Sequence, residues 1–292
     1  MSRNADSMPD AHAHSGRQAT ASKTVDIVVC VHNALTYVKP CLESVIMNSP
    51  RDRTHVFIIN DGSDENTSKY LRGFSTRCPS VTLIESDVNE GYTRSANKGL
   101  RASTADYVVL LNSDTIVPEH WLDRLIECGE SDERIGIVGP LSNAATYQSV
   151  PEIRTAEGDW AVNVLPAGVT VDDMADKVYE LSDRSFPRAF FLNGSCYAIK
   201  RRVIETIGLF DEESFPIGYG EENDYSIRAR EAGFELAVAD HAYVYHAKSR
   251  SFGHERRKAL SQAGRRALEA KHGADKTGAG RDVLETHPSL RR

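Results

Sequence analysis

The sequence predicts an α/β protein with a mixed, mainly parallel central sheet flanked by helices. Short apolar runs of strand length alternate with stretches whose apolar residues recur at helical spacing, which is the pattern of successive βα units. The runs are apolar at consecutive positions, so both faces of each strand are expected to be buried. Polar clusters follow these runs, where open α/β sheets bind their ligands.

Four strand–helix pairs are expected in the first half of the chain. The strands are predicted at residues 25–31, 56–59, 81–84 and 107–111. The helices are predicted at residues 35–47, 64–74, 91–102 and 119–129. The first helix is expected to stop at Ser49-Pro50, because a proline disfavours helical geometry in the residue before it.

The second half is predicted to be less regular. Residues 140–187 show no clear period and contain several Pro, Gly and Asn residues, so a long loop is expected. A strand with a polar interruption is expected at 190–199, and a short helix at 203–207. Two short closing strands are predicted at 237–239 and 242–246.

Composition divides the chain into three regions. Residues 1–23 are polar, lack the apolar core of a secretory signal and are expected to be disordered. Residues 24–253 contain every predicted strand and form the expected globular domain. Residues 254–292 are expected to form a basic helix and tail.

The charge is unevenly distributed over the chain. From residue 248 onward there are twelve Lys/Arg against five Asp/Glu, a net +7, whereas the rest holds twenty-three against thirty-seven, a net −14. The acidic body argues against nucleic-acid binding. The basic tail is either a solvated helix or a peripheral contact with an anionic membrane.

Cysteine usage favours a reducing, cytoplasmic location, with any membrane contact at the inner face of the cell membrane. The five cysteines are odd in number, widely spaced and never in a CxxC motif, which argues against a disulfide framework and a structural zinc site. The sequence contains no apolar run of eighteen residues, so no membrane-spanning helix is expected.

A cluster of three carboxylates, Glu221, Glu222 and Asp224, is the most distinctive local feature. It follows a glycine-rich turn at 218–220 and begins a helix that continues through 225–230. Crowded carboxylates raise one another's pKa, which favours a proton acceptor near neutral pH. The alternative is the ordinary preference for acidic residues at a helix N-terminus.

Four further polar clusters stand at the predicted carboxyl ends of strands and are expected to form one site. They are His32-Asn33, Asp61-Gly62-Ser63, Asn89-Glu90-Gly91 and Asn112-Ser113-Asp114. The Asp114 carboxylate beside an amide oxygen suits Mg²⁺ or Mn²⁺. His246 would add a nitrogen ligand that favours Mn²⁺, although a histidine after an apolar strand is more often a hydrogen-bonded core residue.

Several enzyme classes are disfavoured by missing motifs. The sequence contains neither GxGxxG nor GxxxxGK[ST]. The first absence disfavours a dinucleotide-binding domain, and the second excludes a P-loop NTPase. No Ser-His-Asp or Cys-His arrangement stands in a recognisable context. Nucleotide recognition by strand-end carboxylates and a metal, with a separate base, remains.

The ordered motifs resemble an inverting family 2 glycosyltransferase of the GT-A fold. The resemblance covers about residues 25 to 253 and is carried by segments 25–33, 58–63, 89–91, 96–99, 110–114, 208–212, 220–224 with Arg228, 244–246 and 251–253. It implies a nucleotide-sugar-binding half at 24–139 and an acceptor-binding half at 140–253.

The resemblance also implies donor-binding roles. The donor residues would be Val31, His32, Asn33, Asp61, Asn97, Asn112, Ser113 and Asp114. Asp61 would contact the nucleobase, usually uracil or thymine, and Asn97 would face the nucleotide sugar. Asp114 would be the carboxylate of a DxD-type motif and hold Mn²⁺ or Mg²⁺ together with His246.

Catalysis and acceptor binding are implied at the acidic helix. Glu222 or Glu221 would be the base, and Asp224 or Glu221 would hold the acceptor or cap the helix. The acceptor side would include Asn193, Gly194, Glu221 and Arg228. The implied reaction moves a sugar from a UDP- or dTDP-sugar to a glycan or lipid-linked hydroxyl, as in polysaccharide or cell-surface glycan biosynthesis.

Two departures from the family pattern affect these roles. Asn112 replaces an aspartate found in many relatives, which would weaken metal binding. Glu221-Glu222 replaces Glu-Asp, so the base is assigned only to within one residue.

Two other functions stay open at this point. One is a non-catalytic nucleotide-sugar-binding module, which would need no base. The other is a sugar-phosphate nucleotidyltransferase, whose Gly-rich basic signature near the first strand is missing from residues 28–33.

Overall fold

The computed structural model describes residues 23–248 and 254–278. The expected N-terminal extension therefore lies outside the described residues apart from Lys23, and so does the tail beyond residue 278.

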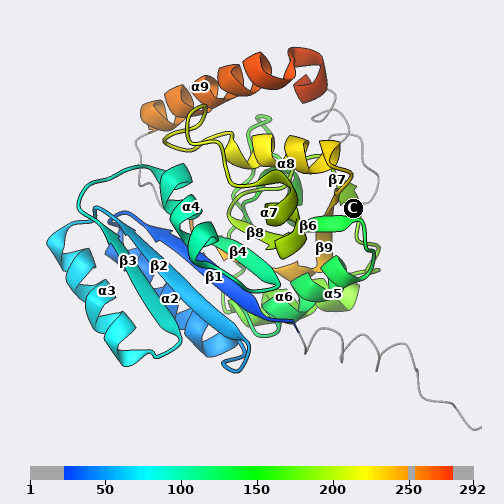
Figure 1. Cartoon of the computed structure of the whole chain (residues 1–292). Coiled ribbons are helices and arrows are strands. Elements are labelled where there is room, and N and C mark those ends of the chain that lie inside the picture. Colours follow the sequence, from blue (N-terminus) through cyan, green and yellow to red (C-terminus); the bar gives the residue numbers. More distant parts are fainter. Residues whose placement is uncertain (1–22, 249–253, 279–292) are drawn as a thin grey trace, which may run out of the picture.

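An eight-stranded sheet forms the centre of the described structure (Figure 1). Its strands lie in the order β3 (Val81–Ser86), β2 (Thr54–Asp61), β1 (Val25–Val31), β4 (Tyr107–Asn112), β8 (Cys196–Lys200), β6 (Ile135–Leu141), β9 (Glu235–Tyr243) and β7 (Arg188–Ala189). Neighbours pair in parallel except around β8 and at β7, which run antiparallel. The prediction of a mixed, mainly parallel sheet is confirmed.

The strand register brings the predicted site residues to one edge. Val31 pairs with Asn60 between β1 and β2, and Cys30 pairs with Asn112 between β1 and β4. The three strands are parallel, so their carboxyl ends and the polar loops that follow lie side by side.

Helices cover both faces of the sheet (Figure 1). They are α2 (Leu35–Asn48), α3 (Glu65–Arg77), α4 (Tyr92–Ala102), α5 (Trp121–Glu130), α6 (Val171–Leu181), α7 (Arg201–Ile207) and α8 (Glu221–Glu231). A short 3₁₀ turn, η1 (Thr146–Gln148), follows β6, and α9 (His254–His272) lies outside α8. Residues of α2, α3 and α5 join one apolar core, and residues of α4, α7 and α8 join the other. The consecutive apolar residues of the strands alternate between these two cores, as expected for a sheet covered on both sides.

The expected loop at 140–187 was wrong in part, because it contains η1 and helix α6. Thr170 and Asp173 form a capping box at the start of α6, in which each side chain accepts from the other residue's backbone N–H. The Thr-x-x-Asp spacing is the sequence pattern that could have predicted the start of this helix.

The boundaries of two predicted strands also differ. The strand expected at 190–199 begins only at Cys196, because the polar residues 193–195 form part of a turn instead. The strand expected at 237–239 extends over Glu235–Tyr243, and the second one shrinks to β10 (Tyr245–His246), which pairs with β5 (Thr115–Ile116).

Helix α9 lies across α8 (Figure 1), and Leu268 packs against Phe215 and Ile227 there. This contact buries apolar residues of α9 against the protein. The described part of α9 therefore does not support the predicted membrane contact. None of the helices described is long and apolar enough to cross a bilayer.

Candidate active site

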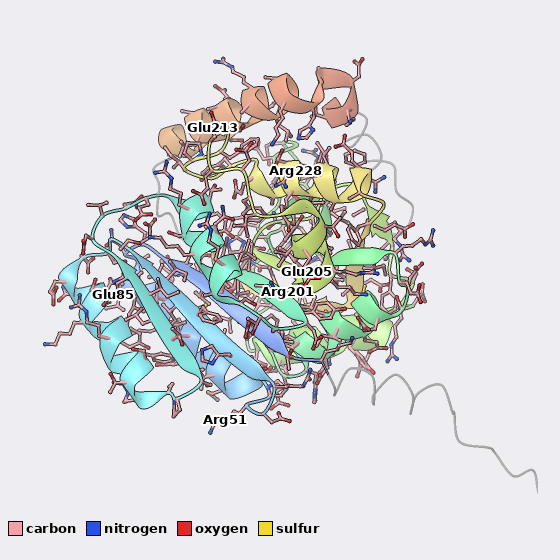
Figure 2. All side chains as sticks on the ribbon, viewed as in Figure 1. Arg51, Glu85, Arg201, Glu205, Glu213 and Arg228 are labelled. Atoms are coloured by element: carbon pink, nitrogen blue, oxygen red, sulfur yellow. The ribbon has the colours of Figure 1, made fainter. Side chains whose placement is uncertain are left out.

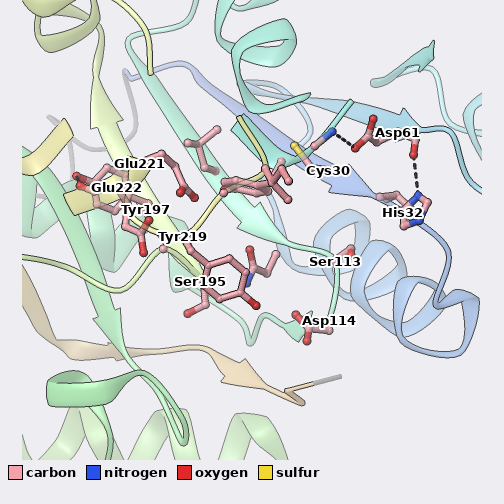
Figure 3. A pocket seen from close by; sticks show the side chains of 18 of the residues that line it. Cys30, His32, Asp61, Ser113, Asp114, Ser195, Tyr197, Tyr219, Glu221 and Glu222 are labelled. Atoms are coloured by element: carbon pink, nitrogen blue, oxygen red, sulfur yellow. Dashed lines mark hydrogen bonds between the residues drawn. The ribbon is translucent and has the colours of Figure 1, made fainter. Parts of the chain in front are cut away.

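A hollow of about 410 Å³ opens at the carboxyl ends of β1, β2 and β4. Most of the predicted site residues line it: Val31, His32, Asp61, Asn112, Ser113, Asp114, Asn193, Gly194, Glu221, Glu222 and His246. Figure 3 shows Glu221 and Glu222 on one side of the hollow and Asp114 on another. Segments separated by more than two hundred residues therefore converge on one hollow.

Asp61 ties the end of β2 to the start of α4. Its carboxylate accepts hydrogen bonds from the backbone N–H of Glu90 at 2.7 Å and of Gly91 at 3.0 Å. Gly91 has a φ of 93°, and a side chain there would press on the Pro216 carbonyl oxygen, so glycine is required. The His32 ring donates from Nδ1 to the Asp61 carbonyl oxygen at 2.8 Å (Figure 3).

Asn33 stands next to the hollow without lining it in the structure. Its backbone N–H donates to the Ser63 hydroxyl at 2.9 Å, and its side-chain oxygen accepts from the Asp64 N–H at 2.7 Å. These bonds hold the loop after β1 against the loop after β2.

Asn97 does not face the hollow, contrary to the sequence-based expectation. Its side chain is fully buried and donates to the Phe210 carbonyl oxygen at 3.0 Å and to Glu212 at 2.7 Å. Its own carbonyl oxygen accepts from the Phe210 N–H at 3.0 Å. The residue thus ties α4 to the segment before α8, a structural role that a buried amide performs when every polar group is satisfied.

Asp224 and Arg228 also lie outside the hollow. Asp224 is fully buried and accepts from Arg228 at 2.8 Å, from Lys271 at 2.7 Å and from His272 at 2.7 Å. Burial opposes ionisation, yet the hydrogen bonds from Lys271 and His272 lower the pKa of Asp224. Figure 2 shows Arg228 on α8 beneath α9, and this ion cluster joins the two helices.

The Asp114 and His246 side chains meet at the rim of the hollow. His246 Nε2 lies 3.2 Å from Asp114 Oδ1, because antiparallel pairing places His246 opposite Thr115. Asn143 holds the His246 backbone in place, accepting from its N–H at 2.7 Å and donating to its carbonyl oxygen at 3.0 Å. Asn143 was not among the predicted site residues, because no motif distinguishes it from other loop asparagines.

These two side chains fit a divalent cation. The carbonyl oxygen of Ala144 lies 3.2 Å from His246 Nδ1 and can only accept, so Nδ1 carries a proton. Nε2 then lies against the Asp114 carboxylate, and a nitrogen and an oxygen this close together can bind one cation. Ligands about 2.0–2.2 Å from one ion, at right angles, are separated by about 3 Å.

The described residues contain no cluster of three or more His, Cys, Asp and Glu side chains arranged around one point. A cation at Asp114 and His246 would therefore need further ligands from water or from a bound phosphate, as is usual for Mg²⁺. Asn112 and Ser113 line the same side of the hollow.

Glu221, which is buried, and Glu222, which is partly buried, form a pair of carboxyl groups, here called the carboxyl pair. Burial raises the pKa of Glu221 well above its usual value, and the neighbouring Glu222 raises it further. Burial also raises the pKa of Glu222. The two carboxyls hydrogen-bond to each other, so the pair retains a proton at a pH where exposed glutamates have lost theirs.

One oxygen on each member of the carboxyl pair is buried without a hydrogen-bond partner among the described residues. Unsatisfied buried carboxyl oxygens are costly, and proteins tolerate them mainly where a ligand or a reaction uses them. The expectation that crowding raises a carboxyl pKa holds for Glu221; the pKa of Glu222 is raised by burial, and that of Asp224 is lowered by its partners.

The hollow includes residues that the sequence analysis missed. Tyr92 begins α4, and burial raises the pKa of its hydroxyl well above the usual value. Tyr219 has a φ of 67° and precedes Gly220, the N-cap residue of α8. Lys248 follows His246 by two residues and brings a positive charge to the hollow. Its position two residues after His246 is the feature of the sequence that could have predicted Lys248 as a site residue.

The sheet order, the hollow at its carboxyl edge and the Asp114–His246 pair define a protein of the GT-A fold. Residues 26–208 match the family model described as Glycosyl transferase family 2. The match covers more than half of the chain, and the protein belongs to this family.

Curated relatives and solved structures agree with this assignment. The chain is 24% identical over 233 residues to a hyaluronan synthase from Pasteurella multocida, covering 72% of this chain and 24% of the synthase. The chain spans about a third or less of the first curated relatives that it matches.

Two solved structures share the fold. A mannosyltransferase from Pyrobaculum calidifontis, in complex with GDP-Man and Mn²⁺, superimposes with a TM-score of 0.59 at 16% identity, covering 91% of this chain and 82% of that one. GalNAc-T7 with UDP, GalNAc and Mn²⁺ also gives 0.59, at 19% identity, covering 77% of this chain and 43% of that one.

Proposed function

We propose that the protein transfers a sugar from a nucleotide-diphosphate sugar to an acceptor hydroxyl, with inversion at the anomeric carbon. The observation that carries this proposal is the placement of the Asp114–His246 pair and the carboxyl pair on different sides of one hollow. A diphosphate held by the first pair would leave the sugar within reach of the second.

The nucleotide is proposed to lie at the end of β1 and β2. Val31, His32 and Asp61 line this part of the hollow, and the family resemblance assigns a uracil or thymine base to it. UDP and dTDP donors are therefore proposed first. The solved neighbours are bound to UDP and to GDP-Man in their own structures, so a guanine donor belongs in the test.

Asp114 and His246 are proposed to hold Mn²⁺ or Mg²⁺, which when bound would act as a Lewis acid toward the departing diphosphate. Lys248 adds a fixed positive charge near the same phosphates. Asn112 is neutral and contributes only its amide oxygen, so we expect weaker metal binding than at a site with two carboxylates.

Glu222 is proposed as the general base, with Glu221 as the partner that sets its protonation. As the acceptor oxygen bonds to the anomeric carbon, its proton passes to the Glu222 carboxylate. The bond from the anomeric carbon to the phosphate oxygen breaks, and its electron pair leaves with the diphosphate. A raised pKa makes Glu222 a stronger base than an exposed glutamate.

The carboxyl pair also argues against a non-catalytic binding module. Two adjacent carboxyls whose pKa values are raised by burial destabilise a fold, and a protein that only binds nucleotide sugar has no use for them. Cytoplasmic location and contact of the basic tail with a membrane stay predictions.

Calorimetry with UDP-, dTDP- and GDP-sugars, each with and without Mn²⁺, tests the proposal. We expect at least one of the uridine or thymidine donors to bind, with an affinity that falls at least about tenfold when the ion is removed. Slow metal-dependent hydrolysis of the same donor would show that the carboxyl pair is catalytically competent. Absence of binding by every nucleotide sugar in the presence of Mn²⁺ would contradict the proposal.

A further inference from the structure

A second hollow of about 430 Å³ adjoins the first and shares Asn193, Tyr219 and Glu222 with it. Its walls come from the 146–160 segment, from residues 189–193 and from the inner side of α9. Its volume lies within the range of roughly 300–1,000 Å³ that is usual for small-molecule sites.

Two aromatic rings form one wall of the second hollow. Tyr147 and Trp160 meet edge to face, with ring centroids 4.7 Å apart and planes at 77°. The Arg154 guanidinium lies 3.9 Å from the centroid of the Trp160 ring and holds that ring in place. Rigid aromatic surfaces bind ligands at a low entropic cost.

Helix α9 contributes both polar residues and the apolar Leu268 to the lining. Arg265 and Glu269 form an ion pair at 2.8 Å and line the hollow together with Ser261. A sugar ring has apolar C–H faces and a rim of hydroxyl groups, so a lining that combines aromatic rings with hydrogen-bond donors and acceptors matches both of its surfaces.

Glu222 stands where the two hollows meet. Its Oε2 atom is buried and lacks a hydrogen-bond partner among the described residues. Because Glu222 lines both hollows, an acceptor hydroxyl held where they meet would lie beside this carboxyl group. The same contact is the one that proton transfer to a base requires.

The α9 wall is fixed firmly to the rest of the molecule. Gly264 packs so closely on the Tyr219 backbone that any side chain there would overlap it. Lys271 and His272 bind Asp224 at 2.7 Å each. This wall lies outside residues 26–208, so it is an addition to the part of the chain that matches the family model.

We propose that the second hollow binds the acceptor as a saccharide, with Trp160 and Tyr147 packing on a sugar ring and α9 selecting among acceptors. This inference rests on the proposed function for the identity of the reaction, but binding at the second hollow is testable without it.

The distribution of tryptophan makes a direct test possible. The chain contains two tryptophans, of which Trp121 is fully buried in the core and Trp160 lines the second hollow. Emission is measured while the full chain is titrated with methyl glycosides and disaccharides of glucose, galactose, mannose, rhamnose, N-acetylglucosamine and glucuronic acid, with UDP and Mn²⁺ present. At least one saccharide is expected to change the emission, and Trp160→Phe is expected to remove that change.

Calorimetry on two variants separates a binding role from a structural one. Trp160→Ala is expected to weaken saccharide binding about tenfold or more, whereas Trp160→Phe, which keeps an aromatic ring, is expected to bind within about threefold of wild type. Both variants should bind nucleotide sugar and hydrolyse it as the wild type does.

The outcomes also separate this inference from the proposed function. Failure of the wild type to bind any nucleotide sugar would defeat the proposed function. Normal donor binding without an emission change from any saccharide, or a change that persists in Trp160→Phe, would overturn the saccharide site. Equal loss of donor binding in Trp160→Ala would overturn it as well, because the residue would then act on the first hollow.

Discussion

Glu222→Gln is expected to reduce sugar transfer by roughly 10²–10⁴-fold while leaving donor affinity within about twofold of wild type. The amide has nearly the shape of the carboxyl group but cannot accept the acceptor's proton. Its neutral side chain also avoids placing a charge in a buried position, so the fold should not suffer. Initial-rate kinetics, with donor binding measured by calorimetry, checks both parts.

Glu221→Gln is the matched control for this experiment. The glutamine side chain is as buried as the glutamate it replaces, and the Glu222 carboxyl stays in place. The variant removes only the carboxyl that shares a proton with Glu222. We expect a smaller loss of turnover and an acid limb of the pH–rate profile that does not move to lower pH, because the hydrogen bond from Glu221 lowers the pKa of Glu222 and its loss would raise that pKa. In the wild type that limb should lie above the usual glutamate range, because the base is active only when deprotonated and burial raises its pKa. Wild-type turnover in Glu222→Gln would remove Glu222 from the role of base.

Asp114→Ala is expected to abolish the dependence of nucleotide binding on Mn²⁺. The substitution leaves His246 as the one remaining side chain of the pair, and a single imidazole holds a hard divalent ion poorly. Calorimetry with UDP in the presence and absence of Mn²⁺ measures the effect, which we expect to be at least about tenfold in affinity.

Asp240→Ala provides the comparison for this second experiment. Asp240 accepts hydrogen bonds from Ser185 and does not line the hollow, so its loss should leave UDP affinity unchanged. If Asp114→Ala binds UDP with the wild-type metal dependence, Asp114 is not a metal ligand.

The fold was predictable because its strands are buried on both faces. Continuous apolar runs such as 25–31 mark such strands clearly, and their parallel order places the residues that follow them at one edge. Asp61, Asn112 and Asp114 were found in this way. Helix α6 was missed because its amphipathic pattern is short and is surrounded by loop residues.

The placement of the predicted site residues that do not line the hollow has a common physical cause. Motif position shows which segment reaches the hollow, but the direction of each side chain depends on packing. Asn97 and Arg228 belong to matching motifs, yet both point into the protein and bind backbone carbonyls there. Trp160 and Lys248 belong to no matching motif and still line the two hollows.

The position of a bound cation tests the account most directly. Crystals grown with UDP and Mn²⁺ allow the ion to be located by its anomalous scattering. We expect the ion to contact both Asp114 and His246, with the diphosphate beside it. Glu222 is expected on the other side of the hollow, where the sugar would lie. Manganese bound at other residues, with these two side chains free of it, would contradict the account.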